Sequence, residues 1–337
     1  GLNGAKALDK SVLKARTMIN MDSEDEGVAT VSCAGGLRVQ FTKEIKRTTV
    51  QGSLLTLKVE GLLGGHSGQD IDKERQNADL LMARMIQRLL KETKGQLVSF
   101  NGGTKDNAIP RECEASLIYE SDEEAAKAEE LACELAETYA EELTPAEPDF
   151  SCEISCETNR TAEAIPQDAA KEFICAMRLA PNGIQKRNIK MDGFVVVSLN
   201  LGVVRTEEDR IVMIFSPRSS VASLQEDTKE RLNTLAETFG FTVSHSSEYP
   251  GWSFKEDSPV REICKESYKE LFGEDLKIEA IHAGLECGLF SDAIKGLDAI
   301  AIGPTIANCH TPDEYLTLDS FERFYEFLKD ILSRLAK

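Results

Sequence analysis

Residues 282–288 read HAGLECG, and residues 303–314 read GPTIANCHTPDE. Together these stretches carry His282 and His310, two of only four histidines in the chain. A short helix, a turn and an apolar strand at residues 299–302 are predicted between them. Both histidines therefore fall on loops at strand ends, where functional groups usually lie in α/β folds. His310 has the character of a zinc ligand, because imidazole binds zinc and the following carboxylates can orient it; an ordinary surface turn explains His310 alone equally well.

Length and charge exclude several classes of protein. The 337 residues suffice for two domains. Asp and Glu number 58 against 39 Lys and Arg, a formal net charge of -19, which argues against nucleic acid and an anionic membrane surface as partners. No apolar run reaches the length of a membrane span. The nine cysteines are irregularly spaced with no paired CxxC motif, as expected for reduced thiols in a cytoplasmic protein.

The middle of the chain predicts two related α+β units. The first has the order β-α-β-β-α-β, with elements at residues 53–60, 70–94, 96–101, 112–120, 123–143 and 149–156. A second, shorter version follows, with elements at residues 166–179, 193–204, 210–216, 221–239 and 241–247. This order is the ferredoxin-like pattern, which predicts an antiparallel sheet with helices on one face.

The two ends of the chain share an alternating α/β pattern that differs from the middle. Strands are predicted at residues 17–22, 28–33 and 276–283, and helices at 260–272 and 318–335. We therefore expect an α/β domain formed by residues 1–36 and 249–337, interrupted by an inserted α+β domain at residues 37–248.

Residues 61–71, GLLGGHSGQDI, join a strand to the helix expected from residue 70. Four glycines surround His66 and would let the backbone approach a ligand, with Asp70 in the first turn of the helix. A phosphate-binding loop is rejected, because neither GKS, GKT nor GxGxxG is present. A lone loop histidine is more often ordinary than catalytic, but this glycine setting favours a functional His66.

Three further polar residues close strands or loops. Asp22 ends a strand and opens an acidic turn, which taken alone favours a solvated turn over a ligand. Asn107 lies in a polar loop between strands, which alone reads as a hairpin turn. Arg218 ends a strand and presents a planar fork suited to a carboxylate, although a surface charge is the default for an arginine.

These motifs together resemble the aminoacyl-histidine dipeptidases (Xaa-His dipeptidases), within the co-catalytic zinc peptidases that include aminoacylase and carnosinase. The matching blocks are residues 20–24 (NMDSE), 33–36 (CAGG), 64–68 (GGHSG), 107–111 (NAIPR), 198–202 (SLNLG), 282–288 and 303–310. The resemblance implies a discontinuous zinc-peptidase catalytic domain with an inserted lid domain of two ferredoxin-like units. Its long insert also points to this subfamily, since other members usually carry a single smaller lid.

The resemblance implies two divalent metal ions, zinc first, with manganese or cobalt as alternatives. Asp22 would ligate one ion and His310 the other. The pair of metals would hold a hydroxide and polarise the scissile carbonyl, and a glutamate would act as general base.

The resemblance also implies roles around the substrate. His66, from the lid, would stabilise the developing oxyanion. Asn107 and Arg218 would bind the substrate, Arg218 through its C-terminal carboxylate. Gly284 and Glu286 would line the pocket beside the metals.

One part of the family pattern has no counterpart in this chain. Family members supply a His-x-Asp ligand pair, a bridging Asp and a Glu-Glu pair upstream of the segment that corresponds to Gly1–Ala5, and no histidine precedes His66. We therefore expect a metal site that is incomplete here, a chain that lacks the family's N-terminal segment, and activity in the parent protein rather than in this chain alone.

The predicted function is metal-dependent hydrolysis of dipeptides, with Xaa-His preferred. One alternative is an inactive fragment whose folded lid dimerises or binds a ligand. Another is a related amidohydrolase that acts on N-acyl amino acids or tripeptides. The expected partners are a small peptide substrate and a second copy through the lid, in the cytoplasm, with no nucleic acid and no membrane.

Overall fold

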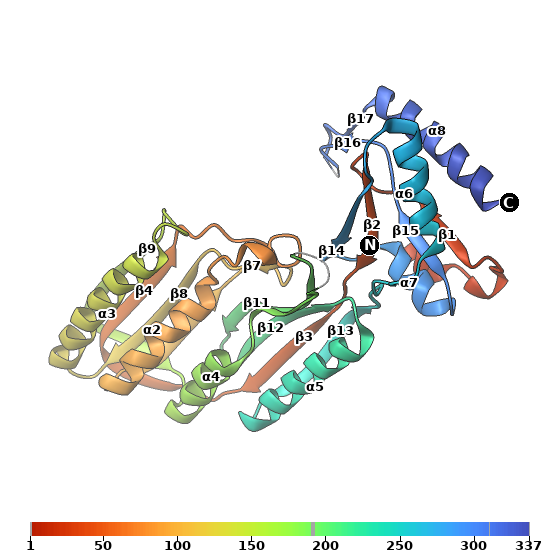
Figure 1. Cartoon of the computed structure of the whole chain (residues 1–337). Coiled ribbons are helices and arrows are strands. Elements are labelled where there is room, and N and C mark those ends of the chain that lie inside the picture. Colours follow the sequence, from red (N-terminus) through yellow and green to blue (C-terminus); the bar gives the residue numbers. More distant parts are fainter. Residues whose placement is uncertain (1, 190–192, 310, 337) are drawn as a thin grey trace. The chain divides into compact units, whose positions relative to one another are not determined.

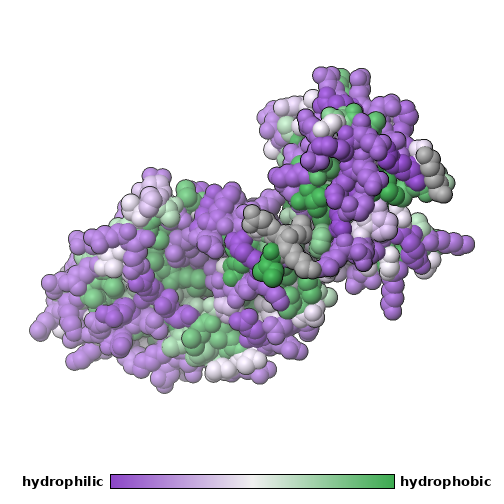
Figure 2. Space-filling model, viewed as in Figure 1, coloured by the Kyte–Doolittle hydropathy of each residue, from purple (hydrophilic) through white to green (hydrophobic). Residues whose placement is uncertain are grey.

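The computed structural model of the chain describes residues 2–189, 193–309 and 311–336. The chain divides into two compact units (Figure 1). Unit 1 consists of Gly1–Gly36, Ser219–Ala222 and Tyr249–Lys337, and unit 2 of Leu37–Arg218 and Ser223–Glu248. Hydrophilic residues cover most of the visible surface of each unit in Figure 2, as the acidic composition requires.

The first half of unit 2 is a βαββαβ unit. Its elements are β4 (Thr48–Glu60), α2 (Ala78–Glu92), β6 (Gln96–Gly102), β8 (Cys113–Tyr119), α3 (Asp122–Leu143) and β9 (Ser151–Ala164). The strands lie in the order β6-β8-β4-β9 and pair antiparallel, with Leu55 opposite Leu117. This is the ferredoxin-like arrangement, so that prediction is confirmed.

The second half repeats the arrangement with an opening strand that the sequence analysis missed. Its elements are β3 (Gly35–Glu44), α4 (Gln167–Leu179), β11 (Val195–Thr206), β12 (Arg210–Ser219), α5 (Ala222–Thr238) and β13 (Thr242–Tyr249). The order β13-β3-β12-β11 places β3 beside strands that follow it by more than a hundred residues. The whole first half of unit 2 is therefore inserted between β3 and α4, the first strand and the first helix of the second half. β10 (Gly183–Arg187) adds a further strand beside β11.

The two halves share one nine-stranded sheet and one core. Helices α2 to α5 lie across one face of the sheet, as predicted (Figure 1). Phe41 of β3 packs on Phe215 of β12 with 4.8 Å between ring centroids, and Phe100 of β6 meets Phe173 of α4 edge-on at 5.4 Å. Because α4 of the second half covers β6 of the first, the Phe100–Phe173 contact joins the two halves.

The helix predicted at residues 70–94 is wrong at its start. α2 begins at Ala78, because the side chain of Asn77 accepts hydrogen bonds from the backbone N–H groups of Asp79 and Leu80 and so caps the helix. The preceding residues form only a 3₁₀ turn, Ile71–Lys73, that ends at a left-handed Glu74. His66 consequently does not stand at a helix N-terminus but in the short strand β5 (Gly65–His66).

Unit 1 contains a small mixed sheet in the order β1-β15-β2-β14. Its elements are α1 (Asn3–Ala7), β1 (Thr17–Asn20), β2 (Val28–Cys33), α6 (Pro259–Phe272), β14 (Lys277–Ile281), α7 (Glu286–Ala293), β15 (Asp298–Ala301), β16 (Ile306–Ala307), β17 (Tyr315–Leu316) and α8 (Leu318–Leu335). β1 runs parallel to β15, and β2 parallel to β14. Tyr268 of α6 meets Phe327 of α8 edge-on at 5.2 Å, which fixes the two long helices together. Within the described ranges, none of the helices has the length and apolar content needed to cross a membrane.

The Asn77 cap provides a test of the corrected helix boundary. Asn77 is buried, and its amide group also donates to the carbonyl of Leu201 at 2.8 Å. We expect Asn77→Ala to lower the free energy of unfolding by about 2–3 kcal/mol, because it removes a cap and leaves buried groups unpaired. Chemical denaturation measures the loss. Ser121→Ala removes the exposed cap of α3 and should cost clearly less; equal costs would contradict the special role of Asn77.

Candidate active site

A two-stranded sheet in unit 2 brings the predicted His66 and Asn107 together. β5 pairs antiparallel with β7 (Ala108–Ile109), and His66 lies opposite Ala108. The backbone N–H of Ser67 donates to the carbonyl of Asn107 at 2.9 Å. Asn107 itself is exposed, so its side chain can reach a ligand beside His66.

The His66 ring is held in one tautomer by the backbone that follows it. Its Nδ1 accepts hydrogen bonds from the N–H groups of Gly68 at 3.2 Å and Gln69 at 3.0 Å. An Nδ1 that accepts cannot carry the proton, so in the neutral ring the proton resides on Nε2. Asp70 fixes the same turn by accepting from the backbone N–H of His66 at 2.7 Å. The half-buried ring therefore presents Nε2–H as a donor.

Arg218 belongs to the same group. It is buried near the end of β12. Burial lowers the pKa of His66, the positive charge of Arg218 lowers it further, and Asp70 partly opposes the shift. An imidazole with a lowered pKa stays neutral at neutral pH. Unit 2 thus combines a neutral donor, a buried guanidinium and an exposed amide.

Two glycines allow the backbone of this loop to turn. Gly64 and Gly65 have φ values of +59° and +140°. A Cβ at Gly65 would lie 2.7 Å from both an Arg75 guanidinium nitrogen and an Asp70 carboxylate oxygen. A side chain at residue 65 would therefore disrupt the turn that holds the His66 ring.

Asn200 supports the loop but received no predicted role, although it lies in the matching block at residues 198–202. It is buried on β11, and its amide donates to the carbonyl of Ala108 at 2.8 Å. Asn77 lies beside it, with the two side chains 3.4 Å apart. An asparagine within an apolar strand pattern is the signal that could have identified it, because such a residue must find buried partners.

Glu147 is a second supporting residue that sequence analysis missed. It follows α3, is 2% exposed, and accepts from the N–H of Leu63 at 2.7 Å and of Gln76 at 2.8 Å. One carboxylate therefore ties the start of the glycine-rich loop to the residue just before the Asn77 cap of α2. Among the many glutamates near the end of α3, sequence gives no signal that this one is buried.

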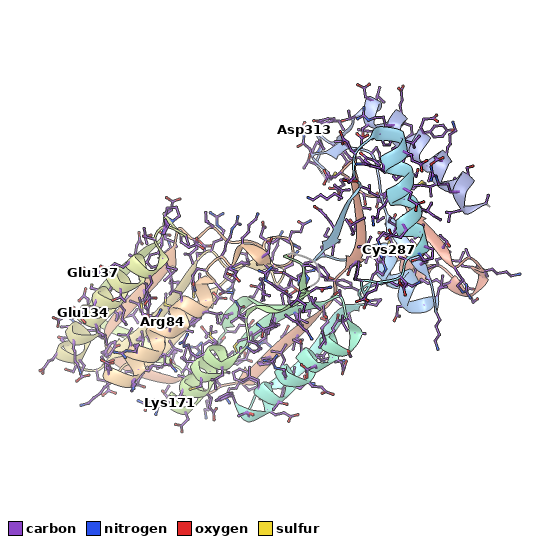
Figure 3. The ribbon with its side chains drawn as sticks, in the orientation of Figure 1. Arg84, Glu134, Glu137, Lys171, Cys287 and Asp313 are labelled. Atoms are coloured by element: carbon purple, nitrogen blue, oxygen red, sulfur yellow. The ribbon has the colours of Figure 1, made fainter. Side chains whose placement is uncertain are left out.

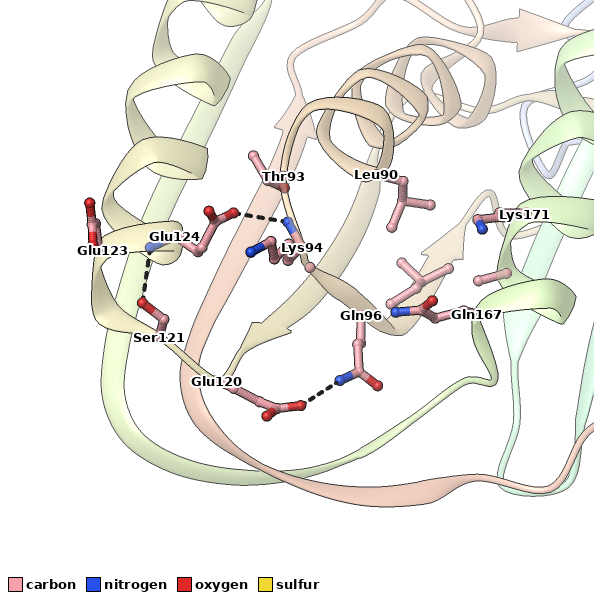
Figure 4. Close-up of a pocket in the computed structure, with 13 residues that line it drawn as sticks. Leu90, Thr93, Lys94, Gln96, Glu120, Ser121, Glu123, Glu124, Gln167 and Lys171 are labelled. Carbon is pink, nitrogen blue, oxygen red and sulfur yellow. Dashed lines mark hydrogen bonds between the residues drawn. The ribbon is translucent and has the colours of Figure 1, made fainter.

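Unit 2 contains one cavity that borders the His66 loop and another that does not. One of about 790 Å³ is lined by Gly65 and Ala108, and so borders the His66 loop. Another, of about 570 Å³, is lined by Lys94, Lys171 and several glutamates (Figure 4). None of the predicted site residues lines the second cavity, so it has no part in the candidate active site.

In unit 1 the loop that carries Asp22 lies against the segment that begins at Gly303. Asp22 is exposed just beyond β1. A Cβ at Gly303 would lie 1.9 Å from the carbonyl oxygen of Ser23, and the N–H of Ile306 donates to the carbonyl of Glu24 at 2.9 Å. This contact aligns the Asp22 loop with the segment before residue 310. The predicted ligand His310 lies outside the described residues.

The HAGLECG stretch surrounds the start of α7. Gly284 faces Tyr249, since a Cβ there would approach the ring to 2.8 Å, and Glu286 is the first residue of the helix. Burial raises the pKa of Cys33 to about 11 and that of Cys287 (Figure 3) to about 12. Both thiols are therefore protonated at neutral pH and do not provide thiolate ligands.

The described residues do not complete a metal site. Within residues 2–189, 193–309 and 311–336, no three His, Cys, Asp or Glu side chains lie close enough to hold one ion. The Asp22 carboxylate is of the right chemical class for zinc, but a single carboxylate is not a binding site.

Comparison with known proteins identifies the family. Residues 103–334 match the model of peptidase family M20/M25/M40, and residues 57–147, in unit 2, match a peptidase dimerisation domain. The chain belongs to peptidase family M20/M25/M40. The predicted zinc-peptidase fold with an inserted lid, and the prediction of a hydrolase acting on peptide bonds, are confirmed.

Two relatives are similar over nearly the whole chain. The cytosol non-specific dipeptidase of Escherichia coli (strain K12) is 33% identical, with 99% of this chain and 69% of that protein covered. The crystal structure of aminoacylhistidine dipeptidase from Vibrio alginolyticus is also 33% identical, with a TM-score of 0.94 over 99% of this chain and 68% of that one. These comparisons give no support to the alternative of an inactive fragment.

The tautomer of His66 can be tested directly by ¹⁵N NMR of the histidine side chains. We expect Nε2–H and a pKa below the ordinary value of about 6.5. The lowered pKa means that stability is full above about pH 6.5 and declines as the pH falls below it, because the unfolded ring takes up a proton first. Arg218→Met should raise the His66 pKa, whereas Arg218→Lys, which keeps the charge, should not. An Nδ1–H tautomer, or a pKa insensitive to Arg218→Met, would refute this electrostatic arrangement.

The role of Glu147 can be tested by Glu147→Gln. Glutamine keeps one acceptor but turns its amide hydrogens toward the second backbone N–H, so we expect a loss of about 1–3 kcal/mol in the free energy of unfolding. Hydrogen exchange at the N–H groups of Leu63 and Gln76 should accelerate. Glu137→Gln on the exposed side of α3 (Figure 3) is the matched control and should change neither quantity. Unchanged exchange in Glu147→Gln would show that this carboxylate does not hold the loop.

Proposed function

We propose that this protein is a metallo-dipeptidase that hydrolyses dipeptides, with Xaa-His preferred. The observation that carries the proposal is the grouping of neutral His66, buried Arg218 and exposed Asn107. This grouping occurs in a chain similar over 99% of its length to two proteins named as dipeptidases.

The unit 2 residues suit the two ends of a short peptide. Arg218 binds the C-terminal carboxylate, since a guanidinium forms strong paired hydrogen bonds with that group. His66 donates its Nε2–H toward the oxygen of the scissile carbonyl, where negative charge develops. Asn107 supplies an amide to the substrate backbone. Because Arg218 would bind the C-terminal carboxylate next to the scissile bond, only short peptides whose chain ends at Arg218 would fit.

Metal ions complete the proposed chemistry. Asp22 would hold one ion and His310 the other, zinc first. A metal ion held by these residues would act as a Lewis acid toward the scissile carbonyl. Gly284 and Glu286 would line the pocket. The general base is not assigned to any residue of this chain.

The two parts of the chain take different roles in this proposal. Residues 1–36 and 249–337 form the catalytic domain, and residues 37–248 form the lid. The match of residues 57–147 to a dimerisation domain supports a homodimer through the lid. The name of the Escherichia coli relative supports a cytoplasmic location.

Arg218→Ala tests the proposal with a series of substrates: Xaa-His and Xaa-Leu dipeptides, their C-terminal amides, tripeptides and N-acetyl amino acids. With Zn²⁺ supplied, we expect the dipeptide Xaa-His to be hydrolysed best. Arg218→Ala should lower kcat/KM for dipeptides about 10–100-fold, the effect of losing a charge-assisted pair of hydrogen bonds. For the amides, which lack the carboxylate, it should have little effect.

Arg231→Ala, at an exposed arginine of α5, is the matched control. Bound zinc is measured in each variant, so that loss of metal is distinguished from loss of substrate binding. Equal loss with dipeptides and their amides would remove the carboxylate role from Arg218. Preference for N-acetyl amino acids or tripeptides would replace the dipeptidase with an amidohydrolase of another specificity.

A further inference from the structure

Unit 1 contains a cavity of about 430 Å³ whose lining includes none of the residues assigned above. It lies between residues 250–258, the first turn of α6, the end of α7 and the start of β15. Its volume falls in the range of small-molecule sites.

The wall of this cavity is fixed before any ligand enters. Trp252 pairs through its backbone with β2. The hydroxyl of Ser253 donates to the carbonyl of Ser220 at 2.7 Å. The buried guanidinium of Arg261 donates to the carbonyl of Lys255 at 2.7 Å and stacks on a neighbouring aromatic ring. Arg261 thus acts within the wall, whereas Lys255 lines the cavity and makes only a loose ion pair, with Asp298 at 3.8 Å.

Two residues that line the cavity each have one buried polar atom without a hydrogen-bond partner among the described residues. Asp298 is 7% exposed; its Oδ2 accepts from the N–H of Val260 at 3.0 Å, but its buried Oδ1 accepts no hydrogen bond and lies 3.8 Å from Lys255 Nζ. The hydroxyl of Ser291 is likewise without one. Buried carboxylate oxygens ordinarily have donors, so an unoccupied acceptor in a cavity wall indicates a missing donor group.

The arrangement of charges restricts the chemistry of that group. Asp298 Oδ1 and Lys255 Nζ form a loose ion pair at 3.8 Å without a hydrogen bond, so each can take a further partner: a donor, best a cation, on Asp298 and an anion on Lys255. A zwitterion whose ammonium and carboxylate groups are attached to the same carbon atom places both charges within a few ångströms of each other. Trp252, Phe254 and Leu297 offer apolar surface for a side chain attached between them.

We propose that this cavity binds a free α-amino acid, with its ammonium group on Asp298 and its carboxylate on Lys255. Free amino acids are the products of dipeptide hydrolysis, so occupancy would rise as substrate is consumed. Binding at this site does not depend on the proposed function, because it needs neither metal nor turnover.

Calorimetric titration of the chain with L-leucine and L-histidine tests the proposal directly. L-leucinamide, which lacks the carboxylate, and N-acetyl-L-leucine, which lacks the ammonium, are the comparison probes. We expect saturable binding of a free amino acid, weakened about tenfold or more by Lys255→Met and by Asp298→Asn. Lys255→Met should not affect leucinamide, and Asp298→Asn should not affect N-acetyl-leucine.

Asp298→Asn keeps an oxygen that can cap α6, so the variant retains the hydrogen bond to Val260, and its thermal midpoint is measured alongside. Lys265→Met, on the exposed face of α6 where Lys265 pairs with Glu262, is the matched control. No saturable binding of either amino acid, or binding equally weakened by all variants, would overturn the proposal. Loss of peptidase activity with amino acid binding intact would overturn the proposed function alone.

Discussion

Two buried amide side chains, Asn77 and Asn200, hold the parts of unit 2 on which the His66 site depends. Asn77 caps α2 and binds the carbonyl of Leu201; Asn200 binds the carbonyl of Ala108 in the strand opposite His66. Each such group costs about 1–3 kcal/mol when it is buried without a partner. The helix start, the central strand and the active-site loop must therefore form together, and the geometry of the loop follows from packing of the whole sheet.

The topology of unit 2 explains why this packing is possible. β3 opens the second ferredoxin-like half, yet the complete first half intervenes before α4. The second half cannot close its sheet until β3 has paired with β12 and β13, which lie far along the chain. Such non-local pairing is entropically costly to form. It is stabilised by the shared core, in which Phe41 contacts both Phe215 and Phe241.

Sequence patterns predicted the elements whose stability is local and failed where distant groups decide. The helices α3, α4, α6 and α8 follow from their apolar periodicity, and their predicted ends agree with the structure to within one residue. The false start of α2 arose because residues 70–77 (DIDKERQN) contain no glycine or proline and include good helix formers, although the apolar positions of the helix begin only at Ala78. There the Asn77 cap and the carboxylate of Glu147, which takes the N–H of Gln76, override helical propensity. β3 was missed although residues 37–42 (LRVQFT) alternate apolar and polar side chains, a local strand signal; only its place between β13 and β12 depends on partners remote in sequence.

The site residues also divide into those with a local sequence signal and those whose role depends on distant contacts. Glycines around His66 favoured a functional role for that residue, because glycine marks close backbone approach. Asn107 was selected only by the family resemblance, since its loop taken alone indicates a hairpin turn. The supporting Glu147 could not be selected, since a glutamate after an acidic helix acquires a role only through burial, whereas Asn200 carried a signal that was not used, an asparagine within an apolar strand pattern. Asp22 likewise received its ligand role from the resemblance, since its strand end taken alone favours a solvated turn, and the structure adds the close contact between Ser23 and Gly303.

The pairing of Arg218 with His66 has a consequence for substrate choice in a chain of net charge -19. The general acidic field repels an anionic peptide, so a local cation is needed at the point where its carboxylate binds. In the proposed function Arg218 would provide that cation, and the same charge lowers the pKa of His66. A protonated imidazole there would compete with the guanidinium for the carboxylate. Because His66 stays neutral, its Nε2–H would remain a donor for an uncharged carbonyl that becomes negative only as the proposed reaction proceeds, and the two groups would act on different parts of the peptide.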